Sequence, residues 1–245
     1  MKELKNSKSD YEKVSKNALI NDNSIIPGTS GVGVDINSSY EAMKRYGSYN
    51  DSLIVFNEVS PTISISNVYD KYIISGNESR NLISFVFVIN NYSYVTEILN
   101  ILNAKGIKST FFIDKDIMED SFDLIKLLNN NNQEIELYSN DYNTKDIKAV
   151  NRLLKKNNMN NLLFCYSEKD SSLILDTCSK NKMHTIIPSI ITSDYPYSDI
   201  KENVKNGSII KLINNKETLR ELKYIINYVI QKGYAPVTLK DLIKE

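Results

Sequence analysis

The sequence contains one histidine and two cysteines, so nitrogen and sulfur ligands for hydrolytic or metal chemistry are scarce. The one histidine, His184, precedes an apolar run, so we expect it at the start of a strand in a structural role. Asp141 is interpreted as a solvated loop acid, because a lone carboxylate rarely holds a catalytic metal. Asp114 and Asp116 follow another predicted strand, where helix capping or turn formation is the expected role.

Nucleophilic side chains also lack partners. Neither Ser139 nor Cys165 has an evident histidine to activate it. The two cysteines, Cys165 and Cys178, are too few for a disulfide framework or a cysteine-type zinc site. One falls at a predicted strand end and the other in the next predicted helix, so we predict two buried free thiols.

The composition is that of a globular protein of 245 residues, 41% hydrophobic and 24% charged. There are 30 basic and 30 acidic residues, so the sequence shows no excess of positive charge that would favour binding to nucleic acid or an anionic membrane. No apolar run reaches membrane-spanning length. Residues 1–23 are polar, so the sequence as given is expected to carry no signal peptide, although an export signal or anchor could have been removed from it.

Three segments are expected along the chain. Residues 1–26 lack apolar periodicity and are predicted to be a disordered or weakly helical lead-in. Residues 27–80 are predicted to be an N-terminal extension that packs on the main domain, with a helix from a capping box at Ser38 to Arg45 and a strand at residues 53–56. Its glycines do not follow a strand in a βαβ unit, which argues against a phosphate loop.

From residue 81 onward, short apolar runs alternate with helix-period segments, which implies parallel strands joined by right-handed crossovers. About seven such units predict a closed or nearly closed (β/α) barrel over residues 81–245, with a doubly wound open sheet as the alternative. Chemistry in a barrel would lie on the loops that follow the strands. The predicted strands are 82–89, 109–113, 134–138, 161–165, 185–190 and 208–213, and the helical stripes are centred on residues 95–102, 122–128, 147–154, 175–178 and 219–229.

Four sequence runs resemble the polysaccharide deacetylases, the NodB-homology family. Residues 96–112 are similar to the family's "ILdiLkkyGvkATFF" run and residues 122–135 to "pdLIkri...GHEIgnH". Residues 207–210 are similar to the start of "GsIiLlHD" and residues 233–239 to "kGYkfVTLsel". The resemblance implies a distorted (β/α) barrel of about seven parallel strands and a metal-dependent hydrolase of carbon–nitrogen, non-peptide bonds that removes acetyl groups from glycans.

The motifs that carry this activity in the family are missing here. The aspartates of TFDDG are replaced by Val88 and Ile89, and the histidines of H-[ST]-x-x-H by Tyr138 and Tyr142. The arginine of the third motif is replaced by Cys165, and the histidine of L-x-H, the catalytic acid, by Ile213. Valine and isoleucine have no lone pair and neutral tyrosine is a poor ligand, so we predict no metal, no cofactor and no catalytic residue at these positions.

Tyrosine faces and amide groups at the predicted barrel mouth are typical of sugar-binding surfaces. The first hypothesis is therefore a catalytically inactive pseudoenzyme of cell-wall context that binds peptidoglycan or another acetylated glycan; sequence drift explains the same residues about as well. The alternatives are an interaction module that binds a protein partner, and a residual deacetylase with relocated ligands. The candidate glycan-binding residues are Asn90, Asn91, Tyr138, Ser139, Asp141, Tyr142, Tyr166 and Asn214.

The resemblance also implies where the protein works. The family's habit is extracytoplasmic, at the cell envelope. Residues 35–80 resemble extensions that precede the barrel in some deacetylase-like proteins of spore-forming Gram-positive bacteria.

Overall fold

Parallel strands in two sheets form the framework of this protein, which is described by a computed structural model over residues 2–245. The larger sheet has the order β11 (Ile190–Ile191), β12 (Ile209–Ile213), β6 (Leu82–Ile89), β7 (Thr110–Asp114) and β8 (Glu134–Tyr138), and β13 (Ala235–Pro236) also pairs with β6. The second has the order β1 (Leu19–Asn21), β2 (Ser24–Ile26), β5 (Tyr72–Ile73), β10 (His184–Ile186) and β9 (Phe164–Tyr166). The strands β6 to β12 run parallel within both sheets, so their C-terminal ends lie at one rim.

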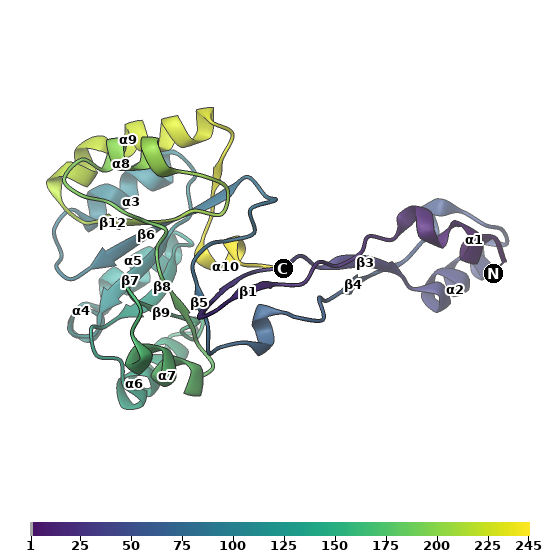
Figure 1. Ribbon diagram of the computed structural model, residues 1–245, viewed down its shortest axis with the longest axis horizontal. Helices are drawn as coiled ribbons and strands as arrows, with labels where there is room; N and C mark the ends of the chain where they lie inside the picture. Colours follow the sequence, from purple (N-terminus) through teal and green to yellow (C-terminus); the bar gives the residue numbers. More distant parts are fainter. Residues whose placement is uncertain (1) are drawn as a thin grey trace. The chain divides into compact units, whose positions relative to one another are not determined.

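Eight helices of the described chain follow or precede these strands. Figure 1 shows α3, α8 and α9 lying together along one side of the larger sheet, and α3 and α8 both contact α9. The helices are α3 (Val95–Ala104), α4 (Lys115–Asp120), α5 (Phe122–Asn130), α6 (Thr144–Lys156), α7 (Ser172–Lys180), α8 (Pro196–Asn203), α9 (Lys216–Gln231) and α10 (Leu239–Leu242).

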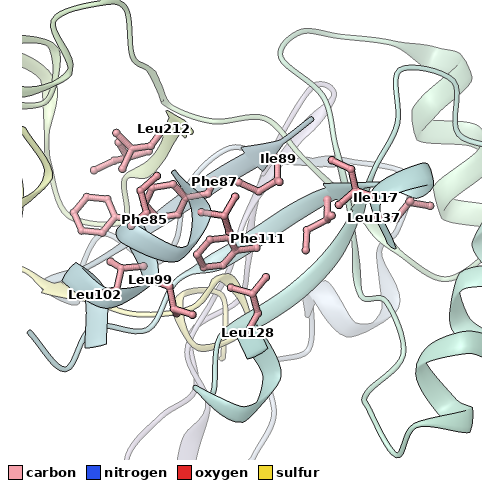
Figure 2. Packing of buried hydrophobic residues seen from close by; sticks show 14 of the residues in the cluster. Phe85, Phe87, Ile89, Leu99, Leu102, Phe111, Ile117, Leu128, Leu137 and Leu212 are labelled. Atoms are coloured by element: carbon pink, nitrogen blue, oxygen red, sulfur yellow. The ribbon is translucent and has the colours of Figure 1, made fainter. Parts of the chain in front are cut away.

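The main hydrophobic core lies between the sheet and its covering helices. Phe87 and Phe111 are fully buried and their rings stack at 5.1 Å between centroids (Figure 2). Alternate residues of each strand, such as Phe85 and Leu212, belong to this core. Because successive side chains of a strand point to opposite faces, Val86, Val88, Phe112, Glu136, Tyr138, Tyr166, Lys211 and Ile213 point to the inner face of the strands.

The ring of strands is not closed by backbone pairing between β8 and β9, which belong to different sheets. Side chains bridge this seam instead. The fully buried carboxylate of Glu136 accepts hydrogen bonds from the backbone N–H groups of Leu163 (2.9 Å) and Phe164 (3.0 Å). The Glu136 carboxylate therefore satisfies backbone N–H groups that a neighbouring strand would satisfy elsewhere in the sheet.

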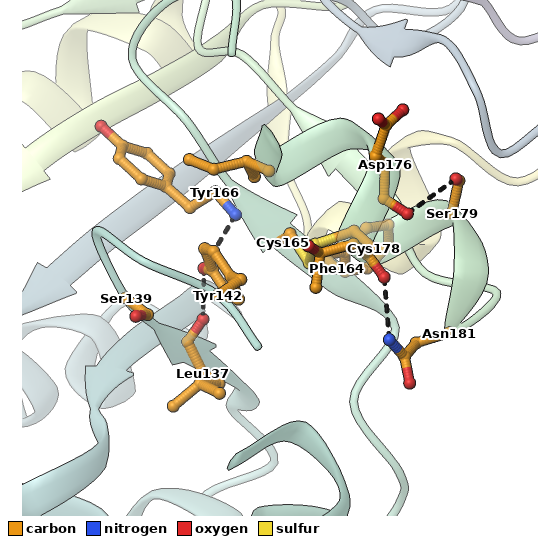
Figure 3. Close-up of a disulfide and its surroundings, with 12 residues drawn as sticks. Leu137, Ser139, Tyr142, Phe164, Cys165, Tyr166, Asp176, Cys178, Ser179 and Asn181 are labelled. Atoms are coloured by element: carbon orange, nitrogen blue, oxygen red, sulfur yellow. Dashed lines mark hydrogen bonds between the residues drawn. A yellow bond between two sulfur atoms is a disulfide. The ribbon is translucent and has the colours of Figure 1, made fainter. Parts of the chain in front are cut away.

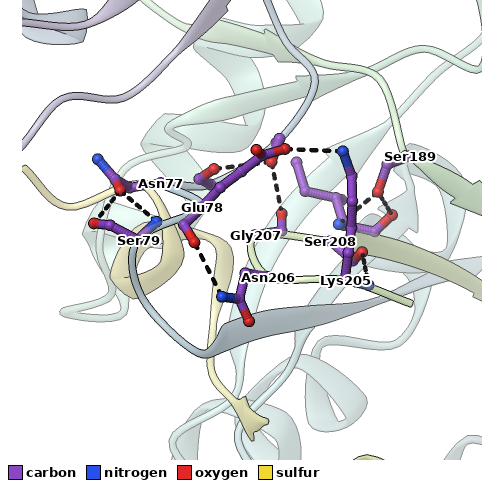
Figure 4. A network of polar contacts seen from close by, with 11 residues as sticks. Asn77, Glu78, Ser79, Ser189, Lys205, Asn206, Gly207 and Ser208 are labelled. Atoms are coloured by element: carbon purple, nitrogen blue, oxygen red, sulfur yellow. Dashed lines mark hydrogen bonds and ion pairs between the residues drawn. The ribbon is translucent and has the colours of Figure 1, made fainter. Parts of the chain in front are cut away.

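A polar network ties together the starts of β6 and β12 (Figure 4). Lys205 pairs with Glu78 at 2.8 Å, and the amide of Asn206 donates to the Glu78 carbonyl. Gly207 has a φ of 79°, and a Cβ there would lie 2.5 Å from the Gly76 carbonyl oxygen, so the close approach of the two segments requires glycine.

Contacts divide the chain into two units: a larger one of residues 20–26 and 68–244, and a smaller one of residues up to Leu19, Pro27–Asn67 and Glu245. The smaller unit has a core of Leu4, Val34, Met43 and Ile54. Its elements are α1 (Lys2–Tyr11), β3 (Gly31–Val34), α2 (Ile36–Tyr46) and β4 (Phe56–Val59), with β3 and β4 antiparallel, and single 3-10 turns at Asp51–Leu53 and Ile65–Asn67.

These units differ from the predicted boundaries at residues 26 and 80. The predicted lead-in of residues 1–26 contains α1 and the strands β1 and β2. β1 pairs with β2, and β2 pairs with the distant β5, a tertiary contact that local periodicity does not show. That residues 27–80 pack on the barrel stays a prediction.

Three local predictions were wrong. The helix α2 is capped by Asp35, whose carboxylate accepts from the Ser38 N–H, so it begins before the predicted capping box. The predicted strand at 53–56 is a 3-10 turn followed by β4. The predicted strand at 185–190 is two strands in different sheets, β10 and β11, because Pro188 lies between them and cannot donate to a ladder.

Candidate functional site

The candidate site lies at the rim where the parallel strands end. Asn90 and Asn91 follow β6, Ser139 follows β8 and Asn214 follows β12. Asn90, Asn91 and Asp141 are exposed, and Ser139 is half-buried. The sequence-predicted residues therefore come from strand ends at one rim, as parallel pairing requires, but they divide into an exposed group and a buried group.

Tyr142 belongs to the buried group, with 3% of its surface exposed. Its hydroxyl donates to the Leu137 carbonyl at 2.7 Å and accepts from the Tyr166 N–H at 3.0 Å (Figure 3). Burial raises the pKa of this phenol. Tyr142 thus joins β8 to β9 across the unpaired seam, and its hydroxyl already serves two backbone groups.

Asn214 is also buried, with 2% exposed. Its side-chain amide donates to the Asn91 carbonyl at 2.9 Å and to the Ser93 carbonyl at 3.0 Å. These bonds hold the loop after β6 against the end of β12, so Asn214 positions Asn91 rather than offering a free amide to a ligand.

Tyr138 is half-buried at the rim, and its ring lies 5.8 Å from the ring of Tyr166 at a tilted angle. The Tyr138 hydroxyl donates to the Asn140 side chain at 2.9 Å, and the Asp141 N–H donates to Ser139 Oγ at 3.1 Å. The exposed part of the site is therefore a tyrosine edge surrounded by amides, a hydroxyl and one carboxylate.

Lys211 and Glu168 form an ion pair at the mouth, with 2.7 Å between Nζ and Oε1. Glu168 also accepts a hydrogen bond from the Tyr166 hydroxyl at 3.2 Å. The bond to Lys211 lowers the pKa of Glu168, whereas burial, with the charge of Glu168, raises the pKa of Tyr166. Neither Lys211 nor Glu168 was among the sequence-predicted site residues, although alternation along β12 places Lys211 on the inner face.

At the positions that hold metal and catalytic residues in the deacetylase motifs, this chain has apolar side chains or tyrosines whose hydroxyl groups bond to other protein groups. Val88 and Ile89 are buried, and Ile89 packs in the core with the helices. Asp114 caps α4 by accepting from the Asp116 N–H, in the role expected for it. Within residues 2–245, no three His, Cys, Asp or Glu side chains are arranged to hold a metal ion. The residues present at the rim thus do not fit a catalytic metal, and Lewis-acid chemistry has no donor set here.

Cys165 corrects a prediction. It forms a disulfide with Cys178 of α7, with 6.4 Å between the Cα atoms, and no free cysteine lies in the described chain (Figure 3). The prediction of two free thiols was wrong because the pairing depends on β9 and α7 packing side by side, which the count of cysteines does not show. The disulfide lies in the outer core, so Cys165 takes no place at the rim.

His184 lies at the start of β10, as predicted, away from the rim. Its ring stacks on Tyr69 at 4.6 Å, and burial lowers the pKa of His184 to about 4. The neutral imidazole is therefore part of the packing at the strand starts.

Glu134 and Glu136 were missed by the sequence reasoning. They line a cavity of about 250 Å³ beside the seam, and burial raises the pKa of both carboxyl groups. The alternation Glu-Ile-Glu-Leu-Tyr along β8 is the signal that could have found them, since it puts both glutamates on the inner face.

Comparisons with known proteins address the fold. No protein-family model matches the chain. A protein of Bacillus subtilis (strain 168) described as uncharacterized, YlxY, is 24% identical over 242 residues, which cover 90% of this chain and 75% of that protein. The solved structure of BA3943 from Bacillus anthracis, described as a CE4 family pseudoenzyme, matches with a TM-score of 0.75 and 21% identity over 100% of this chain and 94% of that chain.

The chain has the fold of a family 4 carbohydrate esterase. PdaA of Bacillus subtilis, a family 4 carbohydrate esterase, matches with a TM-score of 0.64 and 19% identity over 71% of this chain and 85% of that chain. The peptidoglycan N-acetylglucosamine deacetylase Bc1960 matches with a TM-score of 0.61 and 18% identity over 70% of this chain and 92% of that chain. These likenesses confirm the predicted distorted (β/α) barrel of the deacetylase-like type. In the described residues, no helix is long and apolar enough to span a membrane.

Proposed function

We propose that this protein binds a cell-wall glycan at the strand-end rim and does not deacetylate it. The observation that carries the proposal is the contrast at one rim: exposed amides and a tyrosine edge in place of a donor set for metal. Aromatic faces stack on sugar rings and amides pair with hydroxyl groups, so the rim retains binding chemistry although it lacks the means to activate water.

The exposed group of residues is the part of the rim that contacts sugar in this proposal. It consists of Asn90, Asn91, Tyr138, Ser139 and Asp141. The three buried candidates are Tyr142, Tyr166 and Asn214. Their hydroxyl groups and the Asn214 amide nitrogen already bond to protein groups, so they stabilise the rim rather than contact sugar.

An extracytoplasmic location accompanies this proposal. The solved relatives include a peptidoglycan deacetylase, and the Cys165–Cys178 disulfide is typical of an oxidising compartment. Both observations support a protein that works at the cell envelope.

The test is glycan binding measured by calorimetry on soluble peptidoglycan fragments and chito-oligosaccharides, beside an acetate-release assay with and without added zinc, cobalt or nickel. Tyr138→Ala should weaken binding about 10-fold, or about 1.4 kcal/mol. Tyr224→Ala is the matched control, because Tyr224 is an exposed tyrosine on α9, 66% exposed, outside the rim. Acetate release by the pure protein, or equal binding by wild type and Tyr138→Ala, would refute the proposal.

A protein partner is the second candidate, and one observation favours it. The smaller unit is ordered and exposes apolar side chains: Val14 is 90% exposed, and Phe56 is 50% exposed on β4. Exposed apolar surface of this kind is typical of protein contacts. Failure of every glycan to bind, together with a protein that co-purifies with wild type and is lost from Phe56→Ser, would assign the function to this surface.

A further inference from the structure

The carboxylate of Glu168 is held at the barrel mouth by two donors that come from different strands. The Lys211 ammonium, from β12, lies 2.7 Å from Glu168 Oε1, and the Tyr166 hydroxyl, from β9, donates to the same oxygen at 3.2 Å. An ammonium and a phenol that converge on one carboxylate oxygen are the chemistry of a carboxylate-binding site.

The two donors, Lys211 and Tyr166, are buried, whereas the acceptor, Glu168, is exposed. Only 11% of the Lys211 side chain and 2% of Tyr166 are exposed, and Tyr166 packs on Phe112 at 5.4 Å between ring centroids. Glu168 lies in the segment after β9, and 51% of its side chain is exposed. The donors are therefore built into the barrel wall, whereas Glu168 reaches them from a loop.

A lysine on the inner face of a barrel strand needs an anion. The Cα partner of Lys211 in β6 is Val86, and its β11 partner is Ile191, so the neighbouring strands offer the ammonium no acceptor side chain at these positions. Removing a charge from water is costly unless a partner of opposite sign is supplied. Among the described residues, Glu168 is the partner that forms an ion pair with Lys211.

We propose that Lys211 and Tyr166 form a site for the carboxylate of an acidic sugar, and that Glu168 occupies this site until such a ligand displaces it. The proposal rests on the proposed function, because it assigns a ligand class, a glycan that bears a uronate or carboxyalkyl group, to the same rim. The edge of Tyr138, which packs against Tyr166, contacts the sugar ring. The carboxylate of the sugar then replaces the carboxylate of Glu168 beside Lys211.

A ligand carboxylate can displace the Glu168 carboxylate at little cost in free energy. The Glu168 side chain is 51% exposed, so water can solvate its carboxylate once the carboxylate leaves Lys211. A ligand carboxylate gains the same two donors and leaves Glu168 hydrated. The tethered Glu168 nevertheless competes with the ligand, so its removal should increase affinity for the acid.

The experiment compares two probes, a glucuronate-terminated oligosaccharide and its neutral carboxamide, on the full chain. Glu168→Gln should bind the glucuronate probe about 3- to 10-fold more tightly than wild type does. Lys211→Met, which keeps the length of the side chain without its charge, should bind that probe at least 10-fold more weakly. The carboxamide should bind wild type and both variants alike, and circular dichroism checks that each variant is folded.

The outcomes separate this inference from the proposed function. If both probes bind but the glucuronate shows no dependence on Lys211 or Glu168, the carboxylate site is wrong and glycan binding stands. If Glu168→Gln weakens binding of the acid instead of strengthening it, the displacement is wrong. If neither probe binds any of the proteins, this inference is wrong, whereas the proposed function fails only if peptidoglycan fragments and chito-oligosaccharides also do not bind.

Discussion

Replacing Tyr142 by phenylalanine removes one oxygen atom from the seam between β8 and β9. That oxygen donates to the Leu137 carbonyl at 2.7 Å and accepts from the Tyr166 N–H at 3.0 Å, and the side chain is 3% exposed. Phenylalanine fills nearly the same volume, so the change isolates the two hydrogen bonds from the packing of the ring.

The expected loss follows from the two backbone groups left without this partner. A buried polar group that loses its hydrogen bond costs about 1–3 kcal/mol, and partial relaxation of the seam makes the pair less than additive. We therefore expect Tyr142→Phe to lower the free energy of unfolding by about 2–4 kcal/mol. That is a large part of the roughly 5–15 kcal/mol that stabilises a typical domain.

Urea unfolding followed by far-ultraviolet circular dichroism measures this change, since the chain has no tryptophan for fluorescence. Hydrogen exchange by mass spectrometry should also show faster exchange in the peptide that contains Tyr166. Tyr138→Phe is the matched control: its hydroxyl bonds to Asn140 at the rim, so the expected change is under about 0.5 kcal/mol. Unfolding curves within about 0.5 kcal/mol for wild type and Tyr142→Phe, with unchanged exchange in β9, would show that the hydroxyl bridge does not hold the seam.

Two further predictions concern stability. Burial lowers the pKa of His184 to about 4 from 6.5, so the unfolded chain binds the extra proton between these values and the free energy of unfolding should fall as pH drops from about 6.5 to 4, by up to about 1.4 kcal/mol per pH unit. His184→Phe, which keeps the stack on Tyr69, should reduce the difference in Tm between pH 7 and pH 5, and an unchanged difference contradicts a buried neutral imidazole. Reduction of the Cys165–Cys178 bridge, which spans 13 positions, should lower stability by about 3 kcal/mol, measured as a Tm shift with dithiothreitol that Cys178→Ser does not show. Maleimide labelling of the native protein before reduction would contradict the disulfide.

The sequence predicts the elements whose signal is local. β6 and β8 begin and end where their apolar or alternating runs do, and the helical stripe ahead of Gly106 forms α3. In such segments the spacing of apolar residues alone shows which face is buried. The order of strands and helices and the barrel class therefore follow from the sequence. β5 and β13 have two residues each and exist only through pairing with distant strands, which no window of sequence reveals.

The site was only partly predictable for the same reason. Which residues follow strand ends is a local property, and Asn90, Ser139 and Asp141 are accessible at the rim as expected. Which of them are free is a tertiary property. The Tyr142 hydroxyl accepts from the Tyr166 N–H, and the Asn214 amide donates to the Asn91 carbonyl. In both bonds the partner lies far away in the sequence, so local patterns do not predict it.

At position 142, a metal ligand and the closure of this barrel would make different demands on the same side chain. A histidine at position 142 would supply one nitrogen donor, but its shorter side chain would have to reach both the Leu137 carbonyl and the Tyr166 N–H to keep the seam bridged. A nitrogen donor at position 142 would thus replace a hydroxyl that two backbone groups already use. The Tyr142 hydroxyl and the Lys211–Glu168 ion pair therefore connect segments from different strands at this rim, and the side chains present there stabilise the barrel without a metal.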